Sequence, residues 1–507
     1  TGTRTDKIHQ DTPIATEVIS KKEIISSGAT TLQEFLMQRS SISQISSVDG
    51  SGDLQILGMN SQHILILVNG QPITGKFNNR VSFDQISVNG IDRIELLKGP
   101  TSSLYGTEAM GGVINIIYKD VDSNLFTSSF KYRFANKSEK NNMEGYVSIA
   151  KKWSKSHMFS NIYIKSINNN KSVEDIDINT IDERGFSSIY TYNLSDQNSI
   201  NTRIEYYNQD NTTKTLFGGL SSSNEKKVSR VSTILNHTYL LDIKNTIKQS
   251  VLYNVYSKKY GHKDFSGEEG QDLTEENYLK YELNLVRSLE NSIINIGVES
   301  SLSNYLSDRV DGEEDVGLSS IYFQYDSDII NDLNVIMGSR LDYYSDDMFV
   351  NSPRLGIMYH PGNRWKFRFT IGKGFRNPTF MEKYIDWYHE DFNYTVKGNP
   401  ELKAESSLGL YGGVEYYHPT FYQMSLSFYR NYFNNLIDDY TIEPGLLSYT
   451  NFDEAIFSGV EILGRWRISE HYSYSWGMNF MSNKDGNGNI LPNTQPVVTT
   501  SRLNYQN

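Results

Sequence analysis

The sequence predicts two parts: a small N-terminal α+β domain and an all-β antiparallel transmembrane barrel. Three observations lead to this fold class. Helix-like and continuous apolar segments stop near residue 120, alternating strand-like segments come after them, and the connections between those strands alternate between short and long. A length of 507 residues is compatible with about three domains, but a β-barrel of this size forms a single unit.

Composition excludes several classes of protein. A net charge of −12 argues against nucleic acid as the main partner, because nucleic-acid-binding domains carry a basic face. Mean hydropathy is −0.51, and no run reaches the roughly 18 apolar residues of a membrane-spanning helix. Barrel strands alternate and therefore keep hydropathy low, while 35 Tyr and 23 Phe can supply aromatic belts. The absence of cysteine excludes disulfides, Cys-bound zinc and thiol catalysis.

The first domain is expected over residues 1–119. A helix-like stretch covers Thr30–Arg39, and apolar strands cover His63–Val68 and Ile91–Leu97, each bounded by turn-forming residues. The chain opens at Thr1 without a methionine or a signal peptide, which indicates a mature or trimmed form.

The barrel is expected over residues 120–507, where side chains alternate with period two. Phe126, Phe130, Tyr132 and Phe134 share one strand face, and the segments 365–371 and 422–428 alternate in the same way. A soluble β-sandwich would give the same alternation, with its polar face toward water.

Connection lengths separate the two folds. About 18 strand-like segments lie after residue 120. Short connections are Asp242–Thr246, Tyr359–Arg364, His418–Thr420 and Ser469–Tyr472, and long ones are Asn168–Arg184, Gln209–Lys226, Lys258–Glu275, Gly374–Ala404 and Asn434–Asn451. Short turns at one end and long loops at the other are typical of outer-membrane barrels. The chain stops at Asn507 within a strand-like segment, so we expect further strands to complete the sheet.

Residues 51–119 carry a family resemblance. The stretch from Glu95-Leu-Leu-Lys-Gly-Pro100 through Leu104-Tyr105-Gly106 to Gly111-Gly112-Val113-Ile114-Asn115-Ile116 resembles the plug domain of TonB-dependent outer-membrane transporters. Gly398-Asn-Pro-Glu-Leu-Lys-Ala-Glu405 and Phe457-Ser-Gly-Val-Glu461 resemble two barrel motifs of the same family. The resemblance implies a plug inside a barrel of 22 strands in the outer membrane of a Gram-negative bacterium. It also implies uptake of a scarce metal chelate, energised by the inner-membrane TonB complex through the N-terminal segment, because Thr1–Arg4 resembles the residues directly after a TonB box.

The resemblance also implies a plug–barrel lock, in which plug cations meet buried barrel glutamates. The matching candidates are Lys98, Glu405 and Glu461. The second plug cation of the family, the Arg of an Ile-Arg-Gly sequence, is replaced here by Leu57. We therefore expect a weakened or rewired lock, and Lys lacks the bidentate fork of Arg. Ordinary surface charges are the alternative interpretation.

The loop Gly374–Ala404 comes after the thirteenth strand, and strand parity in the family places it outside the cell. Its Phe375-Arg376-Asn377-Pro378, His389 and Asn399-Pro400 resemble the pattern of haem receptors, in which the histidine binds iron. Imidazole is a suitable iron ligand, and Trp387 and Tyr388 are candidates to stack on a flat macrocycle. Asn377 departs from the family's Ala, and similar motifs occur in members that do not bind haem.

A second haem ligand is missing from the corresponding plug loop, whose candidate cargo-binding residues are Lys76, Phe77, Asn78, Asn79 and Arg80. We expect His63 to pack or hydrogen-bond within the plug. Haem is the first cargo hypothesis. A corrinoid such as cobalamin is the second, because the compact plug resembles cobalamin members and the loop carries amide- and phosphate-binding side chains. A ferric siderophore is the third.

Other functions remain as alternatives. Two acidic clusters, Glu174–Glu183 and Asp308–Asp315, are candidates for Ca²⁺, although solvated charge is the default interpretation. No intrinsic cofactor or metal is expected, and no enzyme motif is present. A passive porin or an adhesin barrel would need no globular plug. A surface lipoprotein is a further candidate partner beside membrane lipid.

Overall fold

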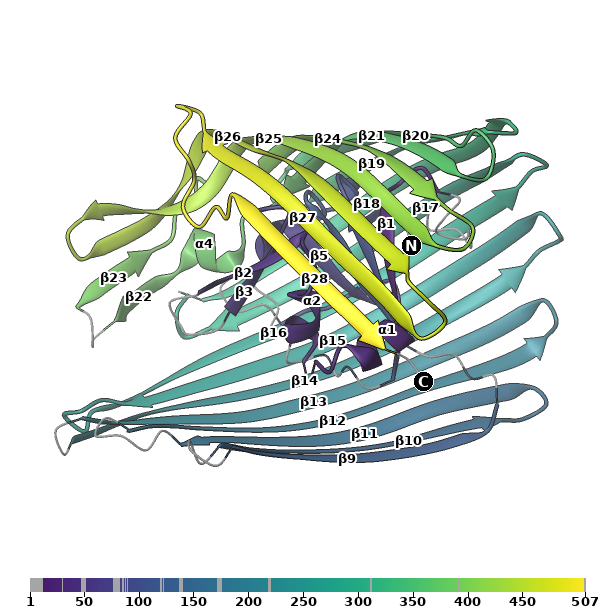
Figure 1. Ribbon diagram of the computed structural model, residues 1–507. Coiled ribbons are helices and arrows are strands. Elements are labelled where there is room, and N and C mark those ends of the chain that lie inside the picture. The colour runs from purple at the N-terminus through teal and green to yellow at the C-terminus, as the bar shows by residue number, and fades with distance from the viewer. Residues whose placement is uncertain are drawn as a thin grey trace.

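The computed structural model describes residues 12–29, 31–46, 52–75, 83, 86, 88, 90–118, 121, 123–135, 140–170, 176–217, 220–310, 312–389 and 393–505. Figure 1 shows the N-terminal elements, in purple, enclosed by a large sheet of long strands. No helix in the described ranges is long and apolar enough to cross a membrane.

The N-terminal domain, called the plug below, contains a five-stranded sheet in the order β1-β7-β8-β5-β6 and a three-stranded sheet in the order β2-β3-β4. Among the described residues, three short α-helices and a 3₁₀ turn accompany them. The elements are β1 (Thr16–Ser20), α1 (Lys21–Ser26), α2 (Leu32–Leu36), β2 (Ile42–Ser46), β3 (Gly52–Ile56), β4 (Met59–Asn60), η2 (Ser61–His63), β5 (Ile64–Val68), β6 (Gln71–Pro72), β7 (Ile91–Lys98), α3 (Ser102–Tyr105) and β8 (Gly112–Tyr118).

The second part is a 20-stranded sheet that forms a closed barrel. Its strands are β9 (Leu125–Ala135), β10 (Lys140–Lys152), β11 (Ser156–Asn170), β12 (Ile176–Ser195), β13 (Asn198–Phe217), β14 (Leu220–Leu240), β15 (Asn245–Lys263), β16 (Glu269–Ser288), β17 (Ser292–Ser307), β18 (Glu313–Ile330), β19 (Leu333–Tyr344), β20 (Phe349–Tyr359), β21 (Trp365–Arg376), β22 (Asp386–His389), β23 (Tyr394–Lys397), β24 (Glu405–Tyr417), β25 (Tyr422–Glu443), β26 (Leu446–Arg467), β27 (Tyr472–Asp485) and β28 (Val497–Tyr505).

The wall itself has 18 long strands, the number that the sequence predicts. β21 pairs directly with β24, so β22 and β23 form a hairpin in the connection between them, together with helix α4 (Phe380–Tyr384). β21 is the thirteenth wall strand, as expected for the strand that precedes this loop.

The alternation is that of a barrel in lipid and not of a soluble sandwich. On β21, Trp365, Phe367 and Phe369 are about 40 % exposed on the outer face, whereas Arg368 and Thr370 are buried against the plug side. Other strands also place apolar side chains outward and polar side chains inward. Lipid solvates the apolar face, while the polar face must find partners inside the barrel.

Four of the expected long loops are mostly strand. β25 and β26 each contain 22 residues and are joined at residues 444–445, and β12 to β16 are 19 to 21 residues long. A tilted strand needs only about 9–11 residues to cross a bilayer, so these hairpins continue beyond it. The prediction failed because polar residues outside the bilayer break the apolar alternation without breaking the ladder hydrogen bonds. The fifth expected loop, residues 374–404, differs from the other four. Its described part contains the separate elements α4, β22 and β23.

The plug is tightly packed at Gly112, whose φ of +149° would place an added Cβ 2.3 Å from the carbonyl oxygen of Leu97. We predict that Gly112→Ala destabilises the plug by about 1–3 kcal/mol, because the backbone of β7 must move. The measurement is calorimetric unfolding of the purified protein. Gly261→Ala in β15 is the control, since its nearest atom lies 3.9 Å away. Equal unfolding temperatures for the two variants would contradict the prediction.

Candidate functional site

A buried ionic cluster ties the plug to the barrel at the end of β7. Lys98 is 5 % exposed, and its Nζ lies 2.6 Å from Glu461 Oε2 on β26 and 3.1 Å from Glu17 on β1. Ser40 also donates a hydrogen bond to Glu461. Of the two partners expected for Lys98, Glu405 and Glu461, the structure pairs it with Glu461. Glu17 is an additional partner that sequence reasoning did not identify.

Charges in this cluster support one another. Burial alone would lower the pKa of Lys98, but Glu461 and Glu17 outweigh it and raise that pKa above its ordinary value. Burial alone would raise the pKa of Glu17, but Lys98 and Arg39 hold it below its ordinary value. Lys98 and Glu17 consequently remain charged at neutral pH.

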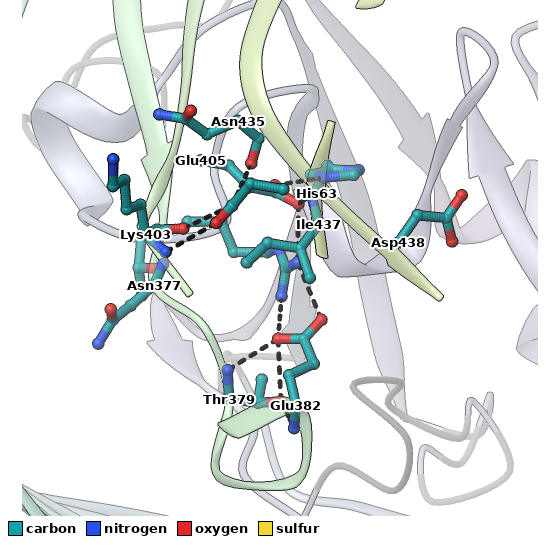
Figure 2. A network of polar contacts seen from close by, with 12 residues as sticks. His63, Asn377, Thr379, Glu382, Lys403, Glu405, Asn435, Ile437 and Asp438 are labelled. Atoms are coloured by element: carbon teal, nitrogen blue, oxygen red, sulfur yellow. Dashed lines mark hydrogen bonds and ion pairs between the residues drawn. The ribbon is translucent and has the colours of Figure 1, made fainter. Parts of the chain in front are cut away.

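A second cluster surrounds Glu405, the first residue of β24, which is fully buried (Figure 2). Its Oε2 lies 2.7 Å from His63 Nε2 in the plug. Its Oε1 accepts hydrogen bonds from Arg376 Nη2 at 2.7 Å and from the backbone N–H of Ile437 at 2.8 Å. One carboxylate thus joins the plug to three strands of the wall.

Arg376 extends this cluster into the loop. Its guanidinium binds Glu382 through two bonds of 2.9 and 3.0 Å, an arrangement that arginine favours. Glu382 is also the third residue of helix α4 and closes a capping box with Thr379. Figure 2 shows Thr379 and Glu382 together on the loop side of the network. The start of α4 is therefore connected through Arg376 to Glu405 and His63.

Leu57, which stands where the family has its second plug cation, explains why Glu405 has different partners here. Leu57 has a φ of +52° in the turn between β3 and β4, and its side chain is 1 % exposed in the plug core. An apolar side chain there cannot neutralise Glu405. Arg376 supplies the charge instead, and His63 contributes a hydrogen bond. Our expectation that His63 bonds within the plug was wrong: it contacts Glu405 of the barrel, and its ring packs edge-on against Phe433.

The predicted cargo residues of the loop lie on the β22–β23 hairpin. The ring of Trp387 contacts two other side chains of the receptor. The guanidinium carbon of Arg309 lies 4.1 Å from the ring centroid, and the ring of Tyr394 packs against Trp387 at a right angle. Tyr388 is half exposed and donates its hydroxyl hydrogen to Asn393. His389 pairs through its backbone with Tyr394, and its side chain lies outside the described part of the structure. Lys76, Phe77, Asn78, Asn79 and Arg80 also lie outside it.

In the second acidic segment, the described side chains form hydrogen bonds with their neighbours. Asp308 accepts a hydrogen bond from the backbone of Leu273, and Asn304 donates to both Glu313 and Asp315. Within the described residues, no group of three or more histidine or acidic side chains is arranged to hold a metal ion. Glu174 and its neighbour Asp175 fall outside those residues.

Family models match almost the whole chain. The TonB-dependent receptor plug domain matches residues 9–113, and the TonB-dependent receptor-like β-barrel matches residues 117–507. The chain belongs to the TonB-dependent receptors. Receptors of this family are outer-membrane proteins of Gram-negative bacteria and not an enzyme class.

Individual relatives either match a small part of this chain or have low sequence identity over most of it. A vitamin B12 transporter BtuB of Vibrio cholerae is 38 % identical over 122 residues, which cover 24 % of this chain and 20 % of that protein. An iron-regulated outer membrane virulence protein of Vibrio cholerae is 22 % identical over 96 % of this chain and 77 % of its own length. The ferric enterobactin receptor PfeA of Pseudomonas aeruginosa has a TM-score of 0.82 at 16 % identity, covering 97 % of this receptor and 84 % of PfeA.

The first ionic cluster yields a stability prediction. Lys98→Met should destabilise the plug by about 3–5 kcal/mol, because it leaves Glu461 buried without its partner. Lys131→Met is the control, since Lys131 is 46 % exposed and forms a loose pair at 3.8 Å; its removal should cost less than about 1 kcal/mol. Denaturant unfolding followed by plug proteolysis measures both. A further variant, Lys98→Met with Glu461→Met, should recover part of the loss, and equal losses in the two single variants would contradict the assignment.

The same cluster gives a pH dependence. Glu17 has an ordinary pKa of 4.5 that is lowered in the folded receptor. Its contribution to plug stability is therefore complete above about pH 4.5 and disappears as the pH falls through the lowered value. The measurement is the free energy of unfolding of the wild type minus that of Glu17→Gln across pH 2–7. This difference should be constant near neutrality and should shrink in acid, within roughly two pH units of the ordinary pKa of Glu17. A difference that grows in acid would refute this.

Proposed function

We propose that the receptor takes up a scarce metal chelate across the outer membrane, energised by the TonB complex. The observation that supports this proposal best is the attachment of the plug. It fills the barrel, yet it is fixed to the wall through discrete ionic clusters at Lys98 and Glu405. Such contacts hold the plug in one position against the wall, because each buried charge needs its partner. A passive porin has no need of a plug anchored in this way.

The Glu405 cluster suggests how a bound cargo affects the plug. A cargo that moves helix α4 displaces Glu382, and this frees Arg376 to bind Glu405 alone. The hydrogen bond between Glu405 and His63 then changes, because one carboxylate serves both partners. The contacts from Glu382 through Arg376 and Glu405 to His63 thus couple the loop to the plug.

Uptake should depend on the proton gradient of the inner membrane. In cells that express this receptor, we expect accumulation of the cargo to fall to the level of receptor-free cells when a protonophore is added or the TonB complex is deleted. Binding to the cell surface should persist, because binding itself needs no energy. Accumulation that survives both treatments would favour a passive pore.

We compare two cargoes. A corrinoid is favoured by relatives named as vitamin B12 transporters, one of which is 24 % identical over 94 % of this chain. Haem is supported by His389 on the β22–β23 hairpin, at the loop end of β21. Since Trp387 is covered by Arg309, a flat macrocycle would have to displace that cation before stacking. We place the corrinoid first.

A titration separates these cargoes. If haem is bound, His389→Ala should weaken it at least about tenfold, because an iron ligand is lost. A corrinoid carries its own cobalt ligands, so its binding should change little. Purified wild type, His389→Ala and the control His360→Ala, which alters a turn at the opposite end of the barrel, are titrated with haem and with cyanocobalamin. Haem binding that depends on His389, without cobalamin binding, would reverse our order.

A further inference from the structure

The plug is attached to the barrel unevenly around its circumference. Its apolar core continues into the wall at β24–β27, through Tyr411, Tyr429, Phe433, Leu436, Ala455, Phe457 and Met481. Both ionic clusters described above lie on this side as well. The described residues of β10–β16 contribute no member to this core.

In a neighbouring sector, the plug bonds to the wall through both a backbone–backbone contact and a wall side chain. The N–H of Glu108 donates to the carbonyl of Phe375, and Arg368 donates to the carbonyl of Thr12. The α3 segment lies along β19–β21, where Gly106 approaches Arg340 closely. Motion here requires the plug backbone to leave the wall.

Among the described residues of the opposite sector, β13–β16, three hydrogen bonds join wall side chains to the plug segment Val68–Gly75. Arg203 donates to the carbonyl of Val68, and Gln71 donates to Ser250. The N–H of Gly75 donates to Glu276. Each of these bonds can be replaced by a bond to water at small net cost.

This sector also contains a partly open cavity of about 10 Å³, which is about the size that admits one water molecule. Plug residues from Val68 to Thr74 line one side, and Arg203, Glu205 and Asn254 line the other. Gln71 Oε1, Thr74 Oγ1, Arg203 Nε and Asn254 Oδ1 are buried without a protein partner among the described residues. The interface is polar and incompletely filled.

Separating the plug from the wall therefore costs different amounts of free energy on the two sides. On the β24–β27 side, apolar surface must be exposed and buried charges separated, whereas on the β13–β16 side polar groups gain water. We propose that the passage for the cargo opens between the plug segment Val68–Gly75 and the wall β13–β16, while the β24–β27 side stays attached.

The lining of this passage defines what it admits. Arg203 and Arg230 lie on the wall beside Glu205, and Lys258 is buried on β15. A cluster of buried tyrosines includes Tyr207 of β13 and Tyr256 of β15. These groups suit a polar chelate that carries amide, carboxylate or phosphate groups. This inference rests on the proposed function, because a passage matters only if the plug moves during uptake.

The cysteine-free chain permits a direct test with single cysteines. Asn254 and Asn431 are each 2 % exposed and face the plug from β15 and β25, and each is the tenth residue of its strand. Asn254→Cys and Asn431→Cys are exposed to a charged maleimide in living cells, with and without a protonophore. We expect Asn254→Cys to react at least about tenfold faster in energised cells.

Ser250→Cys and Ser427→Cys form a second matched pair in case an asparagine variant fails to fold, since each is the sixth residue of the same strands and less than a tenth exposed. Faster reaction on β15 that needs the gradient supports both the passage and energised uptake. Faster reaction on β15 without the gradient supports the passage alone and removes energised uptake. Equal rates, faster reaction on β25, or no reaction at either position overturns the proposal.

Discussion

The closed receptor depends on charges that are buried only because they are paired. Lys98, Glu17 and Glu461 lie in an interface from which water is largely excluded, and none of them could remain there alone. Such pairs contribute little net stability compared with apolar packing, but they strongly disfavour any misplaced arrangement. The plug is thereby held in one position without being fused to the wall.

Glu405 shows how the same requirement can be met by different residues. When position 57 is leucine, the glutamate obtains charge from Arg376 on the adjacent strand and a hydrogen bond from His63. This solution involves the loop directly, because Arg376 also binds Glu382 at the start of α4. The lock between plug and wall therefore also includes the loop of residues 374–404.

The sequence allowed the barrel, the number of wall strands and the Lys98–Glu461 contact to be predicted, because alternation and motif positions are local signals. It did not reveal the partners of Glu405. Arg376 faces Glu405 across β21 and β24, but the inserted loop conceals that register. His63 is 342 residues from Glu405 in sequence, and only the enclosed topology brings them together. Hairpin lengths were also misjudged, since strands outside the bilayer no longer need an apolar face.

Those extended hairpins have a consequence for recognition. A mouth built from flexible loops would lose much conformational entropy when it closes around a cargo. In β25 and β26, by contrast, ladder hydrogen bonds run to the tip of a 22-residue hairpin. This hairpin therefore needs little further ordering when a cargo arrives. Among the described residues, the segment that carries α4 and the β22–β23 hairpin departs from this continuous strand structure.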